Sequence, residues 1–479
     1  MSKYYVTIGI EMHCEGSETK SKVFSPAKNE YSSTPNSNVV AIDMAFPGIL
    51  PVVNKEAVKM SIMMACVLHA RIPEYMYFER KNYYYPDLPK GYQITQNPPE
   101  DCVGNGGYID IERDDETTFR VEIDNLHLEE DSARSTHYYD TTTINYNRAG
   151  APLFELVTKP CIHSADDAIA FLEYIRSIYQ YCGISEADAK KGQIRCDVNI
   201  SISKDENTLG TKVEVKNVNS FMAVREAINY EIERQSDLMD QGRYDEVVQE
   251  TRRWDDETAS TITMRSKEDA LDYKYFVDPN IPKYKISQEW VKEIQESIPE
   301  LPYERKEKYI NKLGLSPYET KKLIRDKAIS DYFEECIKLG ITPKEASNWI
   351  SENIVAYMNK NDLEISEIYL TPKMLKFILD NQKNGTISSK QAKEVFTQVL
   401  DEKKDPSSFI SKENAQISDT AELEKIIDNI IESNPGQVEQ YRSGKDRLFD
   451  FFVGQVMKNT RGKANPIITK ELLKKKLDC

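Results

Sequence analysis

The sequence lacks the short motifs that identify most nucleotide-dependent enzymes. It contains no G-x-x-x-x-G-K-[ST] phosphate loop and no glycine-rich dinucleotide fingerprint, and Gly104-Asn105-Gly106-Gly107 fits neither pattern. A G-x-S-x-G elbow and the protein-kinase motif set are also missing. These absences exclude the common nucleotide-binding and hydrolase classes, so any nucleotide site in this chain would have an unfamiliar architecture.

Cysteine occurs at eight positions but never as a C-x-x-C pair. Paired spacing is typical of cysteine-based zinc sites, so we expect reduced thiols and no structural zinc. No apolar run is long enough to span a membrane, and neither a signal peptide nor a transit peptide follows Met1. We therefore expect a cytoplasmic protein that has no membrane contact.

The net charge of −16 argues against a general nucleic-acid-binding protein. The charge is uneven, however, because residues 441–479 contain ten lysines and arginines against four aspartates and glutamates. A basic end on an acidic chain suits local contacts to phosphates, and it suits a solvated helix end equally well.

Residues 1 to about 290 combine strand and helix patterns. Alternation of polar and apolar residues predicts strands at 5–15, 118–124, 194–203 and 211–218. Helical periodicity predicts helices near 54–71, 165–182 and 220–241. Short hairpin connections between strands favour an α+β fold with a largely antiparallel sheet.

From about residue 300 onward the pattern is helical. A proline-rich segment at 279–302 precedes it, and residues 401–419 are polar and resemble a linker. Helices are predicted near 421–433, 445–459 and 466–477, with a turn at 461–466 before the last one. The chain therefore divides into a mixed first half and a helical second half.

Several predicted strands have one face of ionisable side chains. Because side chains alternate along a strand, Glu11 and His13 project side by side from 5–15, opposite an apolar face. Asp197 and Glu214 occupy the polar faces of 194–203 and 211–218, which a short loop joins as in a hairpin. If these strands share a sheet, the four groups converge.

Two further acidic sites add to this set. Glu155 lies in the otherwise apolar run 153–157, where a lone buried carboxylate is costly and needs a partner, and Glu129-Glu130-Asp131 follows Leu126-His127-Leu128. Several carboxylates with one histidine suit Mg²⁺ or Mn²⁺, which bridges phosphate oxygens. The alternative is that these strands simply have solvated outer faces, and the pattern leaves both interpretations open.

Nine stretches of unusual composition carry a resemblance to a known family. They are residues 8–13, 35–38, 46–54, 80–93, 127–131, 147–153, 195–199, 216–220 and 250–253. On these stretches the chain resembles, over essentially its full length, the GatB family, whose members form part of the glutamyl/aspartyl-tRNA amidotransferases (GatCAB). The archaeal relative GatE carries a large inserted domain. This sequence leaves no room for such a domain, which favours the bacterial type of the family.

The resemblance implies three domains. A cradle-shaped domain is expected at 1–295, an all-helical domain at 296–405 and a small helical YqeY-like tail at 406–479. The tail is expected to contact tRNA through its last two helices. The alternative is that these helices form a bundle core, since Leu448, Phe452 and Val456 recur at helical spacing.

The resemblance also implies a reaction. ATP and Mg²⁺, or Mn²⁺, would phosphorylate the side-chain carboxylate of misacylated Glu-tRNA(Gln) or Asp-tRNA(Asn), and ammonia from an amidase (glutaminase) partner, the A subunit, would displace the phosphate. A small C subunit is the third partner. This chain has no serine-rich amidase signature and no evident cysteine glutaminase motif, so it should not release ammonia itself. The alternatives are a non-catalytic tRNA-binding scaffold and a stand-alone Mg²⁺-dependent ligase.

Site residues carry over from the family by position. The metal ligands implied are His13, Glu130 and Glu155. The catalytic residues implied are Glu11, His13, Lys81, Asp197 and Glu214, with Lys81 contacting a phosphate or carboxylate. The choice of Glu130 rather than Glu129 as a metal ligand requires a β-bulge, because strict alternation would place Glu130 on the apolar face.

Two positions depart from the family pattern. Asn125 stands where arginine is common, and Val277-Asp278 replaces Pro-Glu after residues 273–276. The contacts of these residues are therefore expected to differ from those of relatives.

Overall fold

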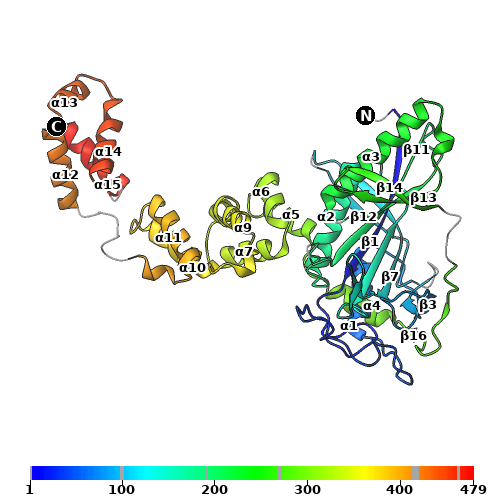
Figure 1. Cartoon of the computed structure of the whole chain (residues 1–479). Coiled ribbons are helices and arrows are strands. Elements are labelled where there is room, and N and C mark those ends of the chain that lie inside the picture. The colour runs from blue at the N-terminus through cyan, green and yellow to red at the C-terminus, as the bar shows by residue number, and fades with distance from the viewer. Residues whose placement is uncertain are drawn as a thin grey trace. The chain divides into compact units, whose positions relative to one another are not determined.

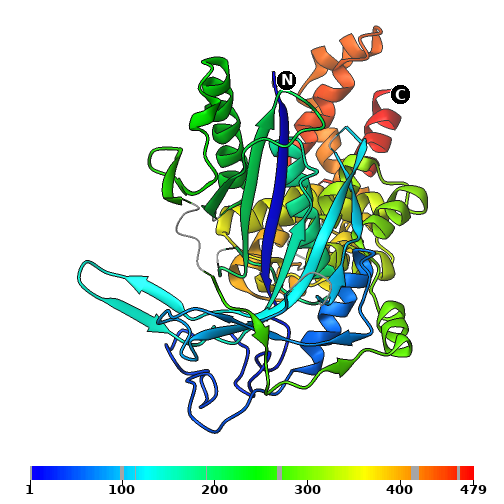
Figure 2. The same ribbon diagram turned by 90° about the vertical axis from the view of Figure 1, so that its right-hand side faces the viewer.

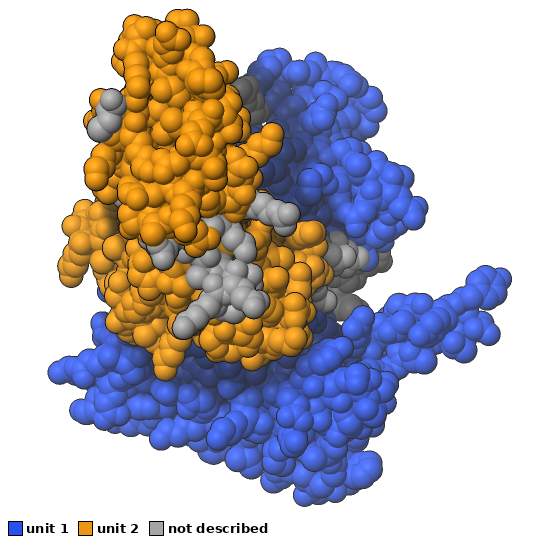
Figure 3. All heavy atoms as spheres, turned by 90° about the vertical axis from the view of Figure 1, so that its left-hand side faces the viewer, with its two compact units in different colours: residues 1–304 blue, residues 305–479 orange. Residues whose placement is uncertain are grey.

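A computed structural model describes residues 3–97, 102–113, 115–189, 191–218, 220–266, 272–410, 420–460 and 464–478. The chain forms two compact units, residues 1–304 and 305–479, which Figure 3 colours separately. The first unit thus continues past the predicted boundary at 295, since Leu301 packs in its core. Residues 461–463 of the predicted turn at 461–466 and residues 411–419 of the predicted linker lie outside the described residues.

The first unit is built from strands and a few long helices. The strands are β1 (Tyr5–Glu15), β2 (Tyr75–Met76), β3 (Glu79–Asn82), β4 (Tyr92–Thr95), β5 (Gly104–Asn105), β6 (Tyr108–Glu112), β7 (Thr118–Glu130), β8 (Arg134–His137), β9 (Thr142–Asn145), β10 (Pro152–Thr158), β11 (Ile194–Ser203), β12 (Val213–Val218), β13 (Glu250–Asp255), β14 (Ser260–Ser266), β15 (Phe276–Val277) and β16 (Tyr284–Lys285). The helices are α1 (Lys55–Val67), α2 (Ala165–Tyr181), α3 (Phe221–Asp240) and α4 (Gln288–Glu296).

A nine-stranded sheet organises the first unit. Its strands follow the order β14-β13-β12-β11-β1-β10-β7-β5, and β6 also pairs with β7. Neighbours in this order are antiparallel, except that β12 and β13 are parallel. Smaller sheets join β15-β3-β4, β16-β2 and β8-β9. The β8–β9 hairpin projects away from the large sheet (Figure 2).

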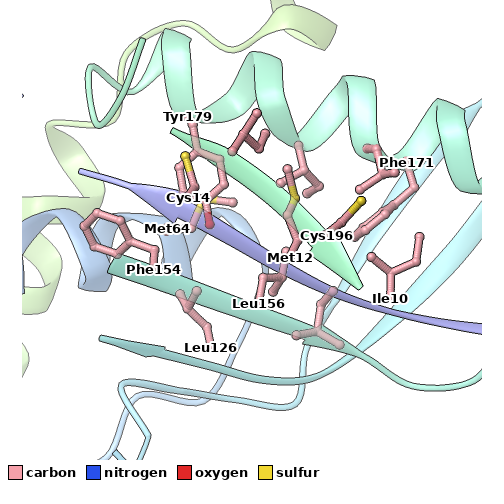
Figure 4. Packing of buried hydrophobic residues seen from close by; sticks show 14 of the residues in the cluster. Ile10, Met12, Cys14, Met64, Leu126, Phe154, Leu156, Phe171, Tyr179 and Cys196 are labelled. Atoms are coloured by element: carbon pink, nitrogen blue, oxygen red, sulfur yellow. The ribbon is translucent and has the colours of Figure 1, made fainter. Parts of the chain in front are cut away.

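The apolar face of the large sheet packs against helices. Along β1 the alternating residues Ile8, Ile10 and Met12 are almost completely buried, as the period-two pattern predicts. Figure 4 shows Ile10 pointing toward Phe171 and Cys14 lying next to Tyr179, both aromatic residues of α2. Helices α2 and α3 lie along this face, and α1 packs on β7 and β5 (Figure 1). The other face of β1 is therefore left for polar side chains.

Local signals set the helix and hairpin positions. Ser164 Oγ accepts a hydrogen bond from Asp167 N and Ser220 Oγ accepts one from Ala223 N, so each serine caps the N-terminus of its helix. In the loop between β11 and β12, a Cβ on Gly210 would lie 1.9 Å from the carbonyl oxygen of Ile202, so only glycine fits.

The second unit is helical. Its helices are α5 (Pro302–Asn311, which begins in the first unit), α6 (Pro317–Ile324), α7 (Lys327–Lys338), α8 (Pro343–Trp349), α9 (Val355–Asn361), α10 (Pro372–Lys383), α11 (Ser389–Glu402), α12 (Thr420–Glu432), α13 (Pro435–Arg442), α14 (Leu448–Asn459) and α15 (Pro466–Leu477). They form two hydrophobic clusters, residues 309–400 and residues 423–477. None of the described helices in either unit is long and apolar enough to cross a membrane.

The predicted α+β class is confirmed, with the antiparallel-rich sheet followed by helical segments. Strands β1 and β11 have the predicted bounds, whereas β7 runs to Glu130 instead of ending at 124. Helix α13 was not predicted, because its short sequence has little amphipathic pattern. Phe452 and Val456 of α14 are fully buried, as a bundle core requires.

Leu156 provides a test of the core. It lies on β10 between Met12 and Leu126 and is fully buried, so Leu156→Ala should lower the free energy of unfolding of the first unit by about 2–5 kcal/mol. Denaturation followed by tryptophan fluorescence in a Trp349→Phe background measures this, because Trp254 and Trp290 then report on the first unit alone.

Leu209→Ala is the matched control, since Leu209 is 63% exposed in the β11–β12 loop and should change stability by less than about 0.5 kcal/mol. Equal stability of the two variants would contradict the described core.

Candidate active site

Ionisable side chains from four adjacent strands form one row on the polar face of the large sheet. The Cα register pairs Arg195 of β11 with His13 of β1, His13 with Glu155 of β10, and Glu155 with His127 of β7. Since directly opposed residues point to the same face, the four side chains are neighbours across the sheet. The sheet therefore brings together residues that are far apart in the sequence.

Glu155 lies at the centre of this row. Its Oε2 is 2.8 Å from His127 Nε2 and 3.3 Å from His13 Nε2. Burial alone would raise the pKa of Glu155, but His127 and His13 together hold it well below its usual value. The buried carboxylate thus has the partners that its apolar sequence context requires.

His127 is held in position by polar neighbours. Its Nδ1 lies 3.0 Å from Asn125 Oδ1, while Asn125 Nδ2 donates to Asp124. With the amide in this orientation, Nδ1–H donates to Asn125 Oδ1, and Nε2–H of the protonated ring donates to Glu155 Oε2. Burial lowers the pKa of His127, but Glu155 outweighs it and the pKa is raised well above its usual value.

Glu129 lies beside His127 on the same face of β7. Its Oε2 is 3.9 Å from His127 Nε2 and accepts a hydrogen bond from Thr95 Oγ1 at 2.9 Å. Burial, followed by the charge of Glu155, raises the pKa of Glu129. Glu129 is 3% exposed, so this carboxylate gains from any additional cation nearby.

Glu11 lies on the other side of the row. Its Oε1 is 3.8 Å from His13 Nε2, and burial together with the charge of Glu155 raises the pKa of Glu11 to about 7. Burial lowers the pKa of His13, but Glu155 outweighs it and raises the pKa above its usual value. Asp197 is the Cα partner of Glu11 on β11 and also contributes to raising the pKa of Glu11.

Asp197 and Glu214 share one lysine. Lys216 Nζ lies 2.5 Å from Asp197 Oδ2 and 3.2 Å from Glu214 Oε1. Thr251 Oγ1 also donates to Glu214, at 2.7 Å. The structure therefore places these two predicted residues in an ion-pair network next to Glu11, and neither belongs to a candidate group of metal ligands within the described residues.

Lys81 on β3 faces the same cluster. Its Nζ lies 5.1 Å from the ring centre of Tyr273, in range of a cation–π interaction. Burial lowers the pKa of Lys81, but Glu129, Tyr275 and Glu155 outweigh it and raise the pKa. A positive charge is thus kept at the edge of the acidic cluster.

Glu130 is the one predicted ligand that the structure places elsewhere. It pairs with Lys90, its Oε1 accepts from Ile94 N at 2.8 Å, and its side chain lies on the face opposite to Glu129. The bulge needed to turn it inward is absent, because the β7–β10 register is regular from Glu130 to Asn125 and shifts only at Val157/Thr158. Glu129 therefore replaces Glu130 in the cluster.

Two groups of side chains have the geometry of a cation site. Ligand atoms of Glu11, His13 and Glu155 lie within 4.8 Å of one another, and so do those of His127, Glu129 and Glu155. Carboxylate oxygens with an imidazole suit Mg²⁺ or Mn²⁺. The donor set thus fits the predicted divalent ion, with Glu155 common to both groups.

Comparison with known proteins gives the family. The family profile described as "GatB/GatE catalytic domain" matches residues 6–292, and the profile described as "GatB domain" matches residues 331–477. The chain belongs to the GatB family. It is 45% identical over 477 residues to a protein of Coxiella burnetii (strain CbuG_Q212) that is named as the B subunit of aspartyl/glutamyl-tRNA(Asn/Gln) amidotransferase, covering 98% of this chain and 99% of that protein.

Proteins of the same name from other bacteria are similarly close. The one from Persephonella marina is 42% identical over 473 residues, covering 98% of both chains. The one from Limosilactobacillus fermentum is 41% identical over 478 residues, covering 99% of both chains. The resemblance inferred from the sequence motifs is thereby confirmed over the full length.

The two departures from the GatB pattern have defined contacts. Asn125 orients His127, as described above. Asp278 is 1% exposed and accepts from Arg80 Nε at 2.7 Å, while the Arg80 guanidinium lies 4.2 Å from the ring centre of Tyr92. Asp278 thus anchors the segment that follows Tyr273 and Tyr275 to β3.

His127 is a site residue that reasoning from the sequence missed. Its signal was present, because continuing the alternation of β7 past residue 124 places His127 and Glu129 on one face and Glu130 on the other.

The central position of Glu155 can be tested through the histidines. Glu155→Gln removes the charge that outweighs burial, so the pKa values of His127 and His13 should both fall. NMR titration of the metal-free protein with labelled histidine measures this, since the chain has only five histidines.

Glu122→Gln is the control, because Glu122 lies on the same strand as His127 but is 55% exposed and pairs with Lys159. Unchanged pKa values of both histidines in Glu155→Gln would show that Glu155 does not lie between them.

Proposed function

We propose that this chain acts in the cytosol as the B subunit of an aspartyl/glutamyl-tRNA amidotransferase. It would use ATP to phosphorylate the side-chain carboxylate of misacylated Glu-tRNA(Gln) or Asp-tRNA(Asn), and ammonia from an amidase partner, the A subunit, would then displace the phosphate. The observation that carries this proposal is the largely buried cluster of acids and histidines around Glu155 on the polar face of the sheet. Its relatives bear the name of this enzyme.

The residues of the cluster suit phosphoryl transfer. Glu11, His13 and Glu155 would hold a divalent ion, with His127 and Glu129 beside them. Such an ion offsets negative charge on the transferring phosphoryl group when it is bound. Lys81, at the edge of the cluster, would contact phosphate or carboxylate oxygens there.

Glu11 would serve as an anionic ligand. Without an ion, burial and the charge of Glu155 raise the pKa of Glu11 to about 7. A divalent ion held by Glu11, His13 and Glu155 would lower this pKa, so Glu11 would bind the ion as a carboxylate. Lys216, paired with Asp197 and Glu214, would keep this side of the site ordered.

The C-terminal residues suit a role in tRNA binding. Residues 441–479 hold ten lysines and arginines, and helices α14 and α15 bury Phe452, Val456 and Leu473 on their packed sides. Packing and phosphate contact are therefore compatible in this segment. The small C subunit would complete the assembly.

The enzymatic role can be separated from a scaffold role. In a complex reconstituted with the A and C partners, Glu155→Gln should lower ATP-dependent amidation of misacylated tRNA by at least about 100-fold while tRNA binding is retained, since the charge between the two histidines is lost. Amide formation on the aminoacyl-tRNA and filter binding of the tRNA measure the two properties.

Glu122→Gln serves as the control and should keep wild-type activity, because Glu122 is an exposed residue of β7. Full activity of the Glu155→Gln complex would instead support the non-catalytic tRNA-binding scaffold, and activity without the partner proteins would support a stand-alone ligase.

The metal ligands can be assigned with a matched pair of neighbours. Glu129→Gln should weaken Mn²⁺ binding by at least about tenfold, because Glu129 faces the cluster. Glu130→Gln should change it by less than about threefold, because Glu130 pairs with Lys90 on the opposite face. Electron paramagnetic resonance of free Mn²⁺ gives both affinities. A larger loss in Glu130→Gln than in Glu129→Gln would reverse the assignment.

A further inference from the structure

Asp131, which directly follows β7, is a buried carboxylate that holds two arginines. It is 3% exposed, and its oxygens lie 3.0 and 2.9 Å from Arg195 Nη2 and 3.2 Å from Arg148 Nε. Ser132 N also donates to it, at 2.8 Å. Burial raises the pKa of Asp131, but Arg195 and Arg148 outweigh it and lower the pKa, so the carboxylate remains charged.

The two arginines differ in how their donors are used. Arg148 binds backbone as well as Asp131, because its Nε donates to Ser132 O and its Nη2 lies 3.4 Å from Ala133 O. Arg195 bonds only to Asp131 within the described part of the chain, and it does so through Nη2 alone. A guanidinium has five N–H donors in a rigid fork, so Arg195 keeps Nε and Nη1 for another acceptor.

Arg195 lies where an acceptor group of a ligand bound at the site could reach its open donors. It is the Cα partner of His13 and shares the polar face with Glu11, Asp197 and the row that contains Glu155. One strand spacing, about 4.8 Å, separates its backbone from that of His13. Its side chain is 42% exposed, so an entering ligand can reach it.

A triphosphate bound at the acidic cluster needs a further positively charged group. A single divalent ion offsets only part of the charge of a triphosphate, and the ion is itself surrounded by carboxylates. Lys216 is occupied by Asp197 and Glu214, whereas Arg195 has open N–H donors at Nε and Nη1, and each can donate a charge-assisted hydrogen bond to a phosphate oxygen.

We propose that Arg195 binds the terminal phosphate of ATP and that Asp131 is a positioning residue that aims its guanidinium at the site. This inference rests on the proposed function, because it takes ATP to be the phosphoryl donor. Lys81 would face the same phosphate from the opposite side of the cluster, since Glu129 and Glu155 lie near it.

Steady-state kinetics of the complex with the A and C partners test this inference. Arg195→Ala should lower kcat/KM for ATP by roughly 10- to 100-fold, as expected for loss of a charged hydrogen bond, while KM for aminoacyl-tRNA stays within about twofold. Added guanidinium chloride at millimolar concentration should restore part of the activity of Arg195→Ala. Arg195→Lys should recover less than half of the loss, because a lysine ammonium lacks the planar, rigidly spaced N–H donors of a guanidinium.

Asp131→Asn should lower kcat/KM for ATP by roughly 5- to 10-fold, with no rescue by guanidinium, since the guanidinium is present but poorly aimed. If Asp131→Asn fails to assemble, the Arg195 variants and the rescue still decide. Arg120→Ala is the control, because Arg120 makes a similar two-bond pair with Asp110 on β6–β7 and is 53% exposed. Arg120→Ala should leave kcat/KM for ATP and KM for aminoacyl-tRNA unchanged.

Two outcomes would overturn the inference. One is an unchanged kcat/KM for ATP in Arg195→Ala. The other is a rise in KM for aminoacyl-tRNA with no change in kcat/KM for ATP, which would show that Arg195 binds the tRNA instead. A wild-type complex that forms amide without consuming ATP would instead refute the proposed function, so the two failures are distinguishable.

Discussion

The antiparallel pairing of β1 with both β10 and β11 is the constraint on which the site depends. Side chains alternate along a strand, so a slip of one residue would turn Glu11 and His13 into the core and expose Met12. The register is therefore held by the burial of the apolar face against α1, α2 and α3. The hydrophobic effect, acting on one face, positions the charges on the other.

Charge compensation explains which acids in this sheet are stable as anions. Glu155 has two histidines, and Lys216 serves two carboxylates of β11 and β12. Glu11 and Glu129 have weaker compensation, and the pKa of each is raised by burial and by the charge of Glu155. A divalent ion placed between them would supply the positive charge that the protein does not. The geometry of the donor atoms and the raised pKa values of the acids therefore both fit a bound cation.

Much of this arrangement follows from local pattern. The bounds of β1 and β11, the helices α1 to α3 and the α+β class come from periodicity and capping residues, which act over a few positions. The same alternation placed Glu11 beside His13, and the cost of burying a lone acid indicated that Glu155 needs a partner. Family resemblance added a choice that the structure revises, since Glu129 and not Glu130 joins the cluster.

Local pattern could not say which partners meet, because the order and register of the strands decide that. β1 pairs with β10 and β11, which lie more than a hundred residues away along the chain, and no short-range rule specifies such a pairing. The contact of Glu155 with His127 arises from the pairing of β10 with β7, and the ion pair of Asp131 with Arg195 depends on the order β11-β1-β10-β7. The sequence by itself determined which faces are charged, and the tertiary structure decided which charges face each other, because distant backbones must pair before their side chains can interact.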